Sequence, residues 1–257
     1  MIGGIHFVSR NQIAQMITVD AGRNRIFRRR HRKWRPIGFL VLVLLFLISA
    51  CGEGAYTHRF RLVVEVLVDG EVKSGYSVIE VVRWDSSGWG FSHAAGIRSI
   101  VRGEAAFVDL GAKGNVAALL RLPPPLGMGA VSGLAQGAFE AQHPGLDWTR
   151  VSSLKGQADL VGRLRPYLIS FLDPNDPTSA RIVQPDAFST VFGPGVALRR
   201  IYIEMTDEPP SQGVLERRLP WVVDGTKAVD AWKAIEGRGF EAGGSIGPSE
   251  LFRRRAR

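Results

Sequence analysis

Ser152 and Lys155 form a Ser-x-x-Lys pattern, in which a lysine can activate a serine nucleophile. Enzymes that use this pattern also need a Ser-Asp-Asn element and a Lys-Thr-Gly strand. Neither occurs in the chain, and the pair falls in a stretch expected to be a polar loop rather than the start of a helix. A two-residue match in this setting predicts no catalysis.

Histidines offer a second kind of chemistry. Beyond the apolar segment near the N-terminus the chain has His58, His93 and His143, and none of them has the spacing of a zinc site. No phosphate-binding glycine loop is present. One enzymatic alternative stays open, an exported hydrolase in which His93 meets a distant serine and carboxylate.

Asp173, Asn175 and Asp176 could supply oxygen ligands to calcium. A helix-loop-helix calcium loop needs an oxygen ligand at its fifth position and glycine at its sixth, where this chain has Pro177 and Thr178. The pattern instead indicates a proline-stiffened turn whose side chains cap its own backbone. No metal and no cofactor is expected.

Aromatic residues flank a polar, glycine-containing stretch at 85–96. Trp84 continues the alternation of the preceding strand and is expected in the core, whereas Trp89 lies between two glycines and Phe91 follows closely. Exposed aromatic side chains suit contact with a glycan or a partner protein. Trp89 and Phe91 are therefore the candidate ligand contacts.

The net charge of +9 would suggest nucleic acid as a partner if it lay on one face. However, residues 1–36 hold nine basic side chains against one acidic residue, and four arginines follow residue 252. The body between these ends is mildly acidic. No nucleic acid partner is expected, because phosphate binding needs a basic surface.

The basic N-terminal stretch is followed by an apolar run of fourteen residues, 37–50. A helix needs about 20 apolar residues to cross a bilayer, so this run is short for a span and typical of the apolar region of a signal peptide. The basic cluster at 28–33 places the preceding end in the cytoplasm and the rest of the chain outside. Residues 1–50 are therefore predicted to be an export signal.

The end of that run reads Leu47-Ile48-Ser49-Ala50-Cys51, and Cys51 is the sole cysteine in the chain. This segment resembles the lipobox of bacterial lipoproteins. The resemblance implies cleavage before Cys51, acylation of its thiol, and a lipid anchor in the membrane. Two or more acyl chains anchor stably, since each buried CH₂ contributes about 0.8 kcal/mol.

Two alternatives for the N-terminal region stay open. Thirty-six residues before the apolar run are long for a signal, so residues 1–15 are interpreted as a mis-assigned start, with initiation at Met16. The alternative to a cleaved signal is that the apolar run is an uncleaved single-pass anchor.

The stretch from Asp173 to Pro209, with Asp-Pro-Asn-Asp-Pro-Thr-Ser and Phe-Gly-Pro-Gly-Val, resembles exported bacterial proteins, which implies export but no activity.

Strands dominate the rest of the chain. Phe60, Leu62, Val64, Val66 and Val68 alternate with other residues, and Asp69-Gly70 then indicates a hairpin turn. The return strand spans 72–84 with a bulge expected at Ser74-Gly75. Further strands are expected at 97–101, 105–110, 116–122, 167–172 and 198–206, with short helices at 131–142, 186–192 and 229–235. This predicts a mainly β (α+β) fold, an antiparallel sandwich or barrel-like core with a few short helices.

The resulting organisation is a signal at 1–50, a lipid-anchored tether at 51–57 and one β-rich domain at 58–236. That domain carries an irregular insertion at 123–157, and a poorly ordered basic tail follows at 237–257. The predicted function is a non-enzymatic envelope lipoprotein, a binding or structural module. Its expected partners are the membrane, through Cys51, and an envelope protein or cell-wall glycan.

Overall fold

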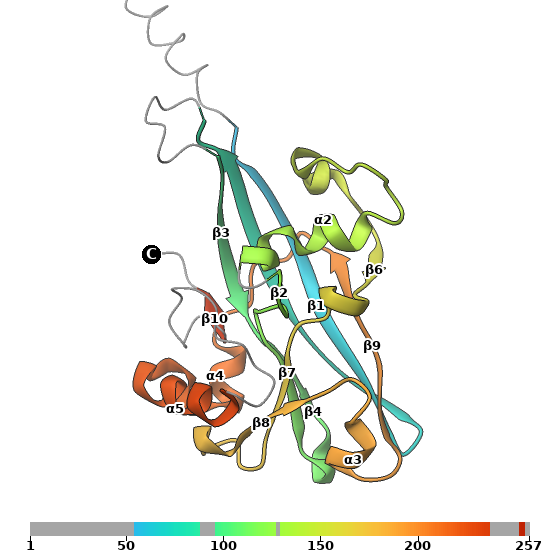
Figure 1. Ribbon diagram of the computed structural model, residues 1–257, viewed down its shortest axis with the longest axis vertical. Coiled ribbons are helices and arrows are strands. Elements are labelled where there is room, and N and C mark those ends of the chain that lie inside the picture. Colours follow the sequence, from blue (N-terminus) through green and yellow to red (C-terminus); the bar gives the residue numbers. More distant parts are fainter. Residues whose placement is uncertain (1–53, 88–95, 127–128, 237–251, 255–257) are drawn as a thin grey trace, which may run out of the picture. The chain divides into compact units, whose positions relative to one another are not determined.

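The computed structural model describes residues 54–87, 96–126, 129–236 and 252–254, all within a compact unit that spans Glu53–Arg257 (Figure 1). Its larger sheet has the strand order β10-β3-β2-β1-β9-β6 and its smaller sheet β4-β5-β7-β8, all paired antiparallel. The strands are β1 (Tyr56–Val68), β2 (Glu71–Asp85), β3 (Ile97–Glu104), β4 (Ala106–Asp109), β5 (Asn115–Ala118), β6 (Gln157–Asp159), β7 (Leu168–Phe171), β8 (Ala180–Val183), β9 (Val196–Met205) and β10 (Arg253–Arg254). The predicted mainly β fold is confirmed, as two open sheets.

Short helical segments connect these strands. The α-helices are α2 (Leu134–Phe139), α3 (Phe188–Phe192), α4 (Val214–Arg218) and α5 (Gly225–Ile235). The 3₁₀ turns are η1 (Gly111–Lys113), η2 (Gly129–Gly133), η3 (Trp148–Ser153), η4 (Gly162–Leu164), η5 (Pro177–Ser179) and η6 (Pro220–Val223). The helices expected near 131–142, 186–192 and 229–235 are present as α2, α3 and α5.

The β1–β2 hairpin forms as its sequence predicts. Asp69 and Gly70 both have positive φ, 52° and 89°, which is the geometry of a two-residue hairpin turn that matches strand twist. The five alternating apolar residues of β1 are all buried on the face that points toward the smaller sheet. The predicted alternation therefore fixes which face of β1 is the core face.

The chain passes from the larger sheet to the smaller one at Ala105. β3 pairs with β2 as far as Glu80 and Arg102, and after Glu104 the chain continues as β4, which pairs with β5. Gly103, with a φ of 136°, lies where a side chain would meet the carbonyl oxygen of Val78 at 2.7 Å. A strand that changes sheets in this way forms a corner of the sandwich.

Gly75 has a different role from the expected one. The β1–β2 register continues past it without a shift, and the irregularity in this sheet lies between β1 and β9, at Glu65–Val66. The bulge predicted at Ser74-Gly75 is therefore wrong. Glycine is needed there because a Cβ would overlap the backbone carbonyl of Phe107, on the β4 strand that crosses β2.

Two hydrophobic clusters lie on opposite faces of the smaller sheet. The first fills the space between the two sheets and includes Phe60, Ile79 and Val116. The second lies between the smaller sheet and the C-terminal helices, where Ala231 of α5, Trp221 and Phe252 are buried. The molecule is thus layered as sheet, sheet and helices.

The segment 123–157, predicted to be an irregular insertion, is irregular but belongs to the core. Val131, Leu134, Phe139 and Val151 are 0–3% exposed and join the cluster between the sheets. Glycines and prolines hide the short apolar pattern, because each apolar group here spans only one or two helical turns. The segment covers the part of the β1–β2 core face that the smaller sheet does not reach (Figure 1).

The predicted poorly ordered tail needs a correction at its one described stretch. Phe252 is completely buried in the second cluster, its carbonyl accepts a hydrogen bond from Ala105, and Arg253–Arg254 pairs with β3. The prediction of a poorly ordered basic tail gave no weight to the apolar Phe252 next to the terminal arginines. Residues 237–251 and 255–257 lie outside the described residues.

The close approach at Gly75 generates a stability prediction. We expect Gly75→Ala to lower the free energy of unfolding by about 3 kcal/mol or more, because the added methyl group meets backbone that cannot rotate away. Gly133→Ala, where a Cβ meets nothing within 4 Å, should change it by less than about 1 kcal/mol. Urea unfolding followed by circular dichroism measures both, and equal effects would contradict this account of Gly75.

Candidate functional site

The sequence-predicted site residues fall mostly outside the described part of the chain. Cys51, Trp89, Phe91 and His93 all lie there, so their predicted roles stay predictions. Trp84 is described, and its expected core position is wrong. It lies on the same side of β2 as Glu80, facing away from the core, and is half-buried.

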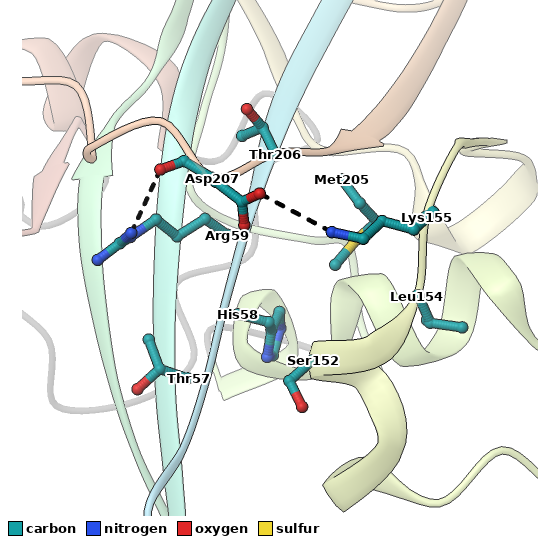
Figure 2. A pocket seen from close by; sticks show the side chains of 9 residues that line it. All are labelled: Thr57, His58, Arg59, Ser152, Leu154, Lys155, Met205, Thr206 and Asp207. Carbon is teal, nitrogen blue, oxygen red and sulfur yellow. Dashed lines mark hydrogen bonds and ion pairs between the residues drawn. The ribbon is translucent and has the colours of Figure 1, made fainter.

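A cleft of about 290 Å³ opens where β1 begins, near the end of the sheet from which the N-terminal segment leaves (Figure 2). Three segments that are distant in sequence meet there: the first residues of β1, the end of η3 with the chain that follows it, and the end of β9 with the chain that follows it. Its lining is Thr57, His58, Arg59, Ser152, Leu154, Lys155, Met205, Thr206 and Asp207. We call it the His58 cleft.

His58 is the most constrained residue of the cleft. It continues the core-face series of β1 two residues before Phe60, against which its ring stacks, and it is only 5% exposed. Its Nε2 atom is buried and has no hydrogen-bond partner in the described part of the chain. Burial, together with the positive charge of Arg83, lowers the pKa of His58 to about 4. At neutral pH His58 is therefore uncharged.

Arg83 lies beside His58 on the core face of β2. Its guanidinium donates to the side-chain oxygen of Gln136 at 3.1 Å and lies 5.2 Å from the ring centre of Trp148. Tyr56 packs edge-on against the same tryptophan, with ring centres 5.3 Å apart. Burial lowers the pKa of Arg83, and the nearby carboxylate of Asp147 opposes that effect. The positive charge of Arg83 and the burial of His58 therefore both disfavour protonation of His58.

The other wall of the cleft is held by charge pairs on the outer face of the large sheet. Glu80, which is 4% exposed, accepts from Arg59 at 2.7 Å and from Arg102 at 2.5 Å, and the three residues are direct cross-strand neighbours. Burial raises the pKa of Glu80, but the bonds from Arg102 and Arg59 outweigh that effect and lower it overall. Arg59 is thereby fixed, and it also donates to the backbone carbonyl of Asp207 at 3.4 Å.

Residues 207–213 cross this outer face as a strap. Glu208 accepts a two-pronged bond from Arg61, and Ser211 exchanges hydrogen bonds with the backbone of Val78, at the place where β3 has left β2. The carboxylate of Glu104 then accepts from the backbone amides of Gly213, Val214 and Leu215. The strap therefore joins the rim of the cleft to α4.

The cleft holds potential nucleophiles but not in a reactive arrangement. Ser152 Oγ donates to the carbonyl of Thr149 at 3.5 Å, and among the described residues no hydrogen bond joins it to His58. Lys155 Nζ instead faces the carboxylate of Asp207 at 3.8 Å (Figure 2). A triad needs the serine, base and carboxylate to be linked in sequence, and that linkage is not made here. The described geometry is that of a polar cleft without an activated serine nucleophile.

Among the described residues, no group of three His, Cys, Asp or Glu side chains is placed to hold a metal ion. The loop at 173–176 forms the predicted capped turn. Asp173 accepts from the amide of Asn175 and Asp176 from the amide of Thr178, both at 2.9 Å.

A second concavity of about 400 Å³ lies at the opposite end of the sheets. Its lining is Phe107, Asp109, Gly111, Ala112, Gly114, Asn115, Leu172, Pro174, Arg217 and Arg218. Asn115, its most buried polar side chain, already exchanges hydrogen bonds with the backbone of Phe171. Arg218 pairs with Asp109 at 3.1 Å. These polar groups are satisfied within the protein, which makes the His58 cleft the stronger candidate.

Comparison with known proteins assigns no relationship: no family model, curated protein or solved structure matches the chain. Among the residues that the structure describes, no helix is both long and apolar enough to cross a membrane.

Sequence reasoning missed His58 and Arg83 as site residues. The available signal was strand alternation: His58 occupies a core-face position of β1 two residues before Phe60, and Arg83 follows Ile79 and Val81 on the core face of β2. A titratable residue in such a series predicts a special environment. Ser152 and Lys155 were noticed as a motif, but it was the fold that brought them to β1.

The lowered pKa of His58 predicts a pH-dependent stability. The unfolded chain takes up a proton near pH 6.5 and the native state only near pH 4, so stability is complete above 6.5 and is lost as the pH falls toward 4. Between pH 7.5 and pH 4.5 we expect the wild type to lose about 2.5 kcal/mol more unfolding free energy than His58→Gln.

Urea denaturation at the two pH values measures this difference. His143→Gln, at an exposed position, is the matched control and should keep the wild-type response. A wild-type response in His58→Gln would show that His58 does not titrate below its ordinary range.

Proposed function

We propose that this chain is an exported lipoprotein, held at the membrane through Cys51, whose folded domain acts by binding. The observation that carries the proposal is the order of three sequence features. A basic cluster, a fourteen-residue apolar run and the sole cysteine follow one another with the spacing of a lipoprotein signal. Lipidation also accounts for a lone cysteine at this position, since no disulfide within the chain is possible.

The start of the folded domain is compatible with such an anchor. β1 begins at Tyr56, five residues after Cys51. A chain that is to be cut and acylated at Cys51 needs that residue accessible, and a tether before the first strand supplies the access. β1 already includes Tyr56 and Thr57, the last two residues of the predicted tether at 51–57.

Binding is the favoured activity because of the His58 cleft. It presents the hydroxyl groups of Thr57, Ser152 and Thr206, an uncharged buried histidine and the opposed charges of Lys155 and Asp207. A ligand with several hydrogen-bonding groups, such as a cell-wall saccharide or a segment of an envelope protein, matches this lining. His58 adds an uncharged imidazole to this lining, and its buried Nε2 has no hydrogen-bond partner among the described residues.

The alternative function, an exported hydrolase, is supported by one observation: Ser152, His58 and Lys155 line the same cleft. It requires Ser152 to rotate toward His58 on substrate binding. A fluorophosphonate probe that labels wild type but not Ser152→Ala would favour the hydrolase. Absence of labelling in folded protein, beside a labelled control hydrolase, favours binding.

Processing at Cys51 gives the direct test of the anchor. The full chain is expressed in a bacterium beside Cys51→Ala, and the N-terminal peptide from the membrane fraction is analysed by mass spectrometry. We expect a wild-type peptide that begins at Cys51 and carries acyl chains, and an unprocessed Cys51→Ala chain. Ser153→Ala, which is exposed and outside the cleft lining, controls for expression and should be processed normally.

An intact and unacylated 37–51 segment in the wild type would contradict the proposal. That result would identify a single-pass anchor and leave Cys51 without a role. The position of the domain outside the cytoplasm would still follow from the basic cluster at 28–33.

A further inference from the structure

The β3 side of the larger sheet is uncovered along most of its length (Figure 1). β10 pairs with only the last two residues of β3, Gly103 and Glu104, and the carbonyl of Phe252 extends that pairing to Ala105. Residues 97–102 pair with β2 on one side, and no strand of the described residues pairs with them on the other. We call this stretch the open edge. It is about 20 Å long, since each strand residue spans about 3.3 Å.

The strand register determines which backbone groups the open edge presents. Ser86 donates a backbone hydrogen bond to Gly96 in the β2–β3 register, so the even-numbered residues of β3 bond to β2. In an antiparallel pair the intervening residues direct their N–H and C=O groups to the other side. These residues are Ile97, Ser99 and Val101, and the described residues offer them no backbone partner. Their donors and acceptors are therefore placed to pair with a further strand.

The open edge lacks the features that usually prevent strand addition. Edge strands are commonly protected by proline, by a bulge or by being very short. β3 contains no proline and pairs with β2 without a shift of register, whereas β6 at the opposite edge has only three residues. Two exposed isoleucines lie on opposite faces of β3, Ile97 at 50% and Ile100 at 39% exposure. An added strand would cover part of both.

Charge decides which kind of strand fits the open edge. On the outer face of the sheet, Glu80 is shared by Arg59 and Arg102, so this row of three side chains carries one net positive charge. Arg98 adds a second positive charge, two residues from Arg102 on the same face of β3. If two copies of the chain paired antiparallel through this edge, Arg98 would lie opposite or diagonal to an arginine of the other copy, which is unfavourable. A segment with acidic side chains avoids this repulsion.

We propose that the open edge binds an extended, acidic segment of a partner protein by strand addition. The backbone groups of Ile97, Ser99 and Val101 pair with the segment, and acidic side chains at its alternate positions face Arg98 and Arg102. The open edge is distinct from the His58 cleft, whose lining includes no residue of β3. The proposal therefore stands apart from both the lipid anchor and the ligand of the cleft.

Peptide titration of the full chain, purified in a mild detergent, tests the proposal. The probe is a fluorescent peptide with acidic residues at alternate positions, Thr-Glu-Val-Glu-Thr-Glu-Val-Thr, and the matched probe has lysine in place of each glutamate. Fluorescence anisotropy gives the affinity, and hydrogen exchange read by mass spectrometry gives the place of binding. With the acidic peptide at about ten times its dissociation constant we expect about tenfold slower exchange over 97–102, and less than about twofold slowing with the lysine peptide.

Ser99→Pro and Ser99→Ala form a matched pair of variants. The N–H of Ser99 faces the open edge, so proline removes that donor while the bonds between β2 and β3 remain, and alanine keeps it. We expect Ser99→Pro to bind the acidic peptide about tenfold more weakly than the wild type and Ser99→Ala to bind it equally well. Circular dichroism confirms that each variant is folded.

Arg98→Glu tests the charge preference without altering the backbone. It should bind the lysine peptide about threefold more tightly than the acidic one, the reverse of the wild type. Unchanged exchange over 97–102 with the acidic peptide at millimolar concentration would overturn the proposal, as would equal binding by folded Ser99→Pro. A wild-type dimer in analytical ultracentrifugation that is lost in Ser99→Pro would also overturn it, in favour of a second copy. None of these results depends on Cys51 or on the His58 cleft.

Discussion

The passage of one strand between the two sheets is the constraint on which the rest of this structure depends. β3 belongs to the large sheet and β4 to the small one, and only Ala105 separates them. Backbone must therefore cross backbone at close range, which is possible because Gly75 and Gly103 carry no side chains there. A residue with a Cβ at either position would push the two sheets apart and open the cluster between them.

This crossing also creates the secondary features around it. When β3 turns away, the backbone of Val78 loses its neighbour, and Ser211 of the strap takes that place. Glu104, at the corner, is then buried with its carboxylate directed at the first amides of α4. Such an arrangement satisfies a buried charge and the free amides of a helix start with one side chain. One backbone corner thus positions the strap and the helix, and through them a wall of the cleft.

Strand periodicity predicted β1, β2 and β9 of the large sheet well, because these strands are long, whereas the two- and three-residue strands β10 and β6 were not predicted. β1 and β2 have 13 and 15 residues, enough for alternation to be read with its turn. The strands of the small sheet have four residues each, and both their faces are buried between two clusters, so alternation is lost. The core role of 123–157 and of Phe252 was hidden for a related reason, since isolated apolar residues in irregular chain have no period. Long-range pairs such as Arg61 with Glu208 leave no local signal at all.

The same difference in strand length explains where the cleft lies. Four-residue strands cover only part of the core face of β1 and β2, and α2 and η3 cover most of the remainder (Figure 1). His58 lies near the edge of the area that these segments cover. It is buried enough to be uncharged at neutral pH, and its Nε2 atom has no hydrogen-bond partner among the described residues. A base with a pKa of about 4 is too weak to remove a proton efficiently at neutral pH. His58 nevertheless stays an uncharged hydrogen-bonding group in a buried part of the cleft wall. An uncharged His58 that makes no hydrogen bond to Ser152 supports the proposed binding role over the proposed hydrolase.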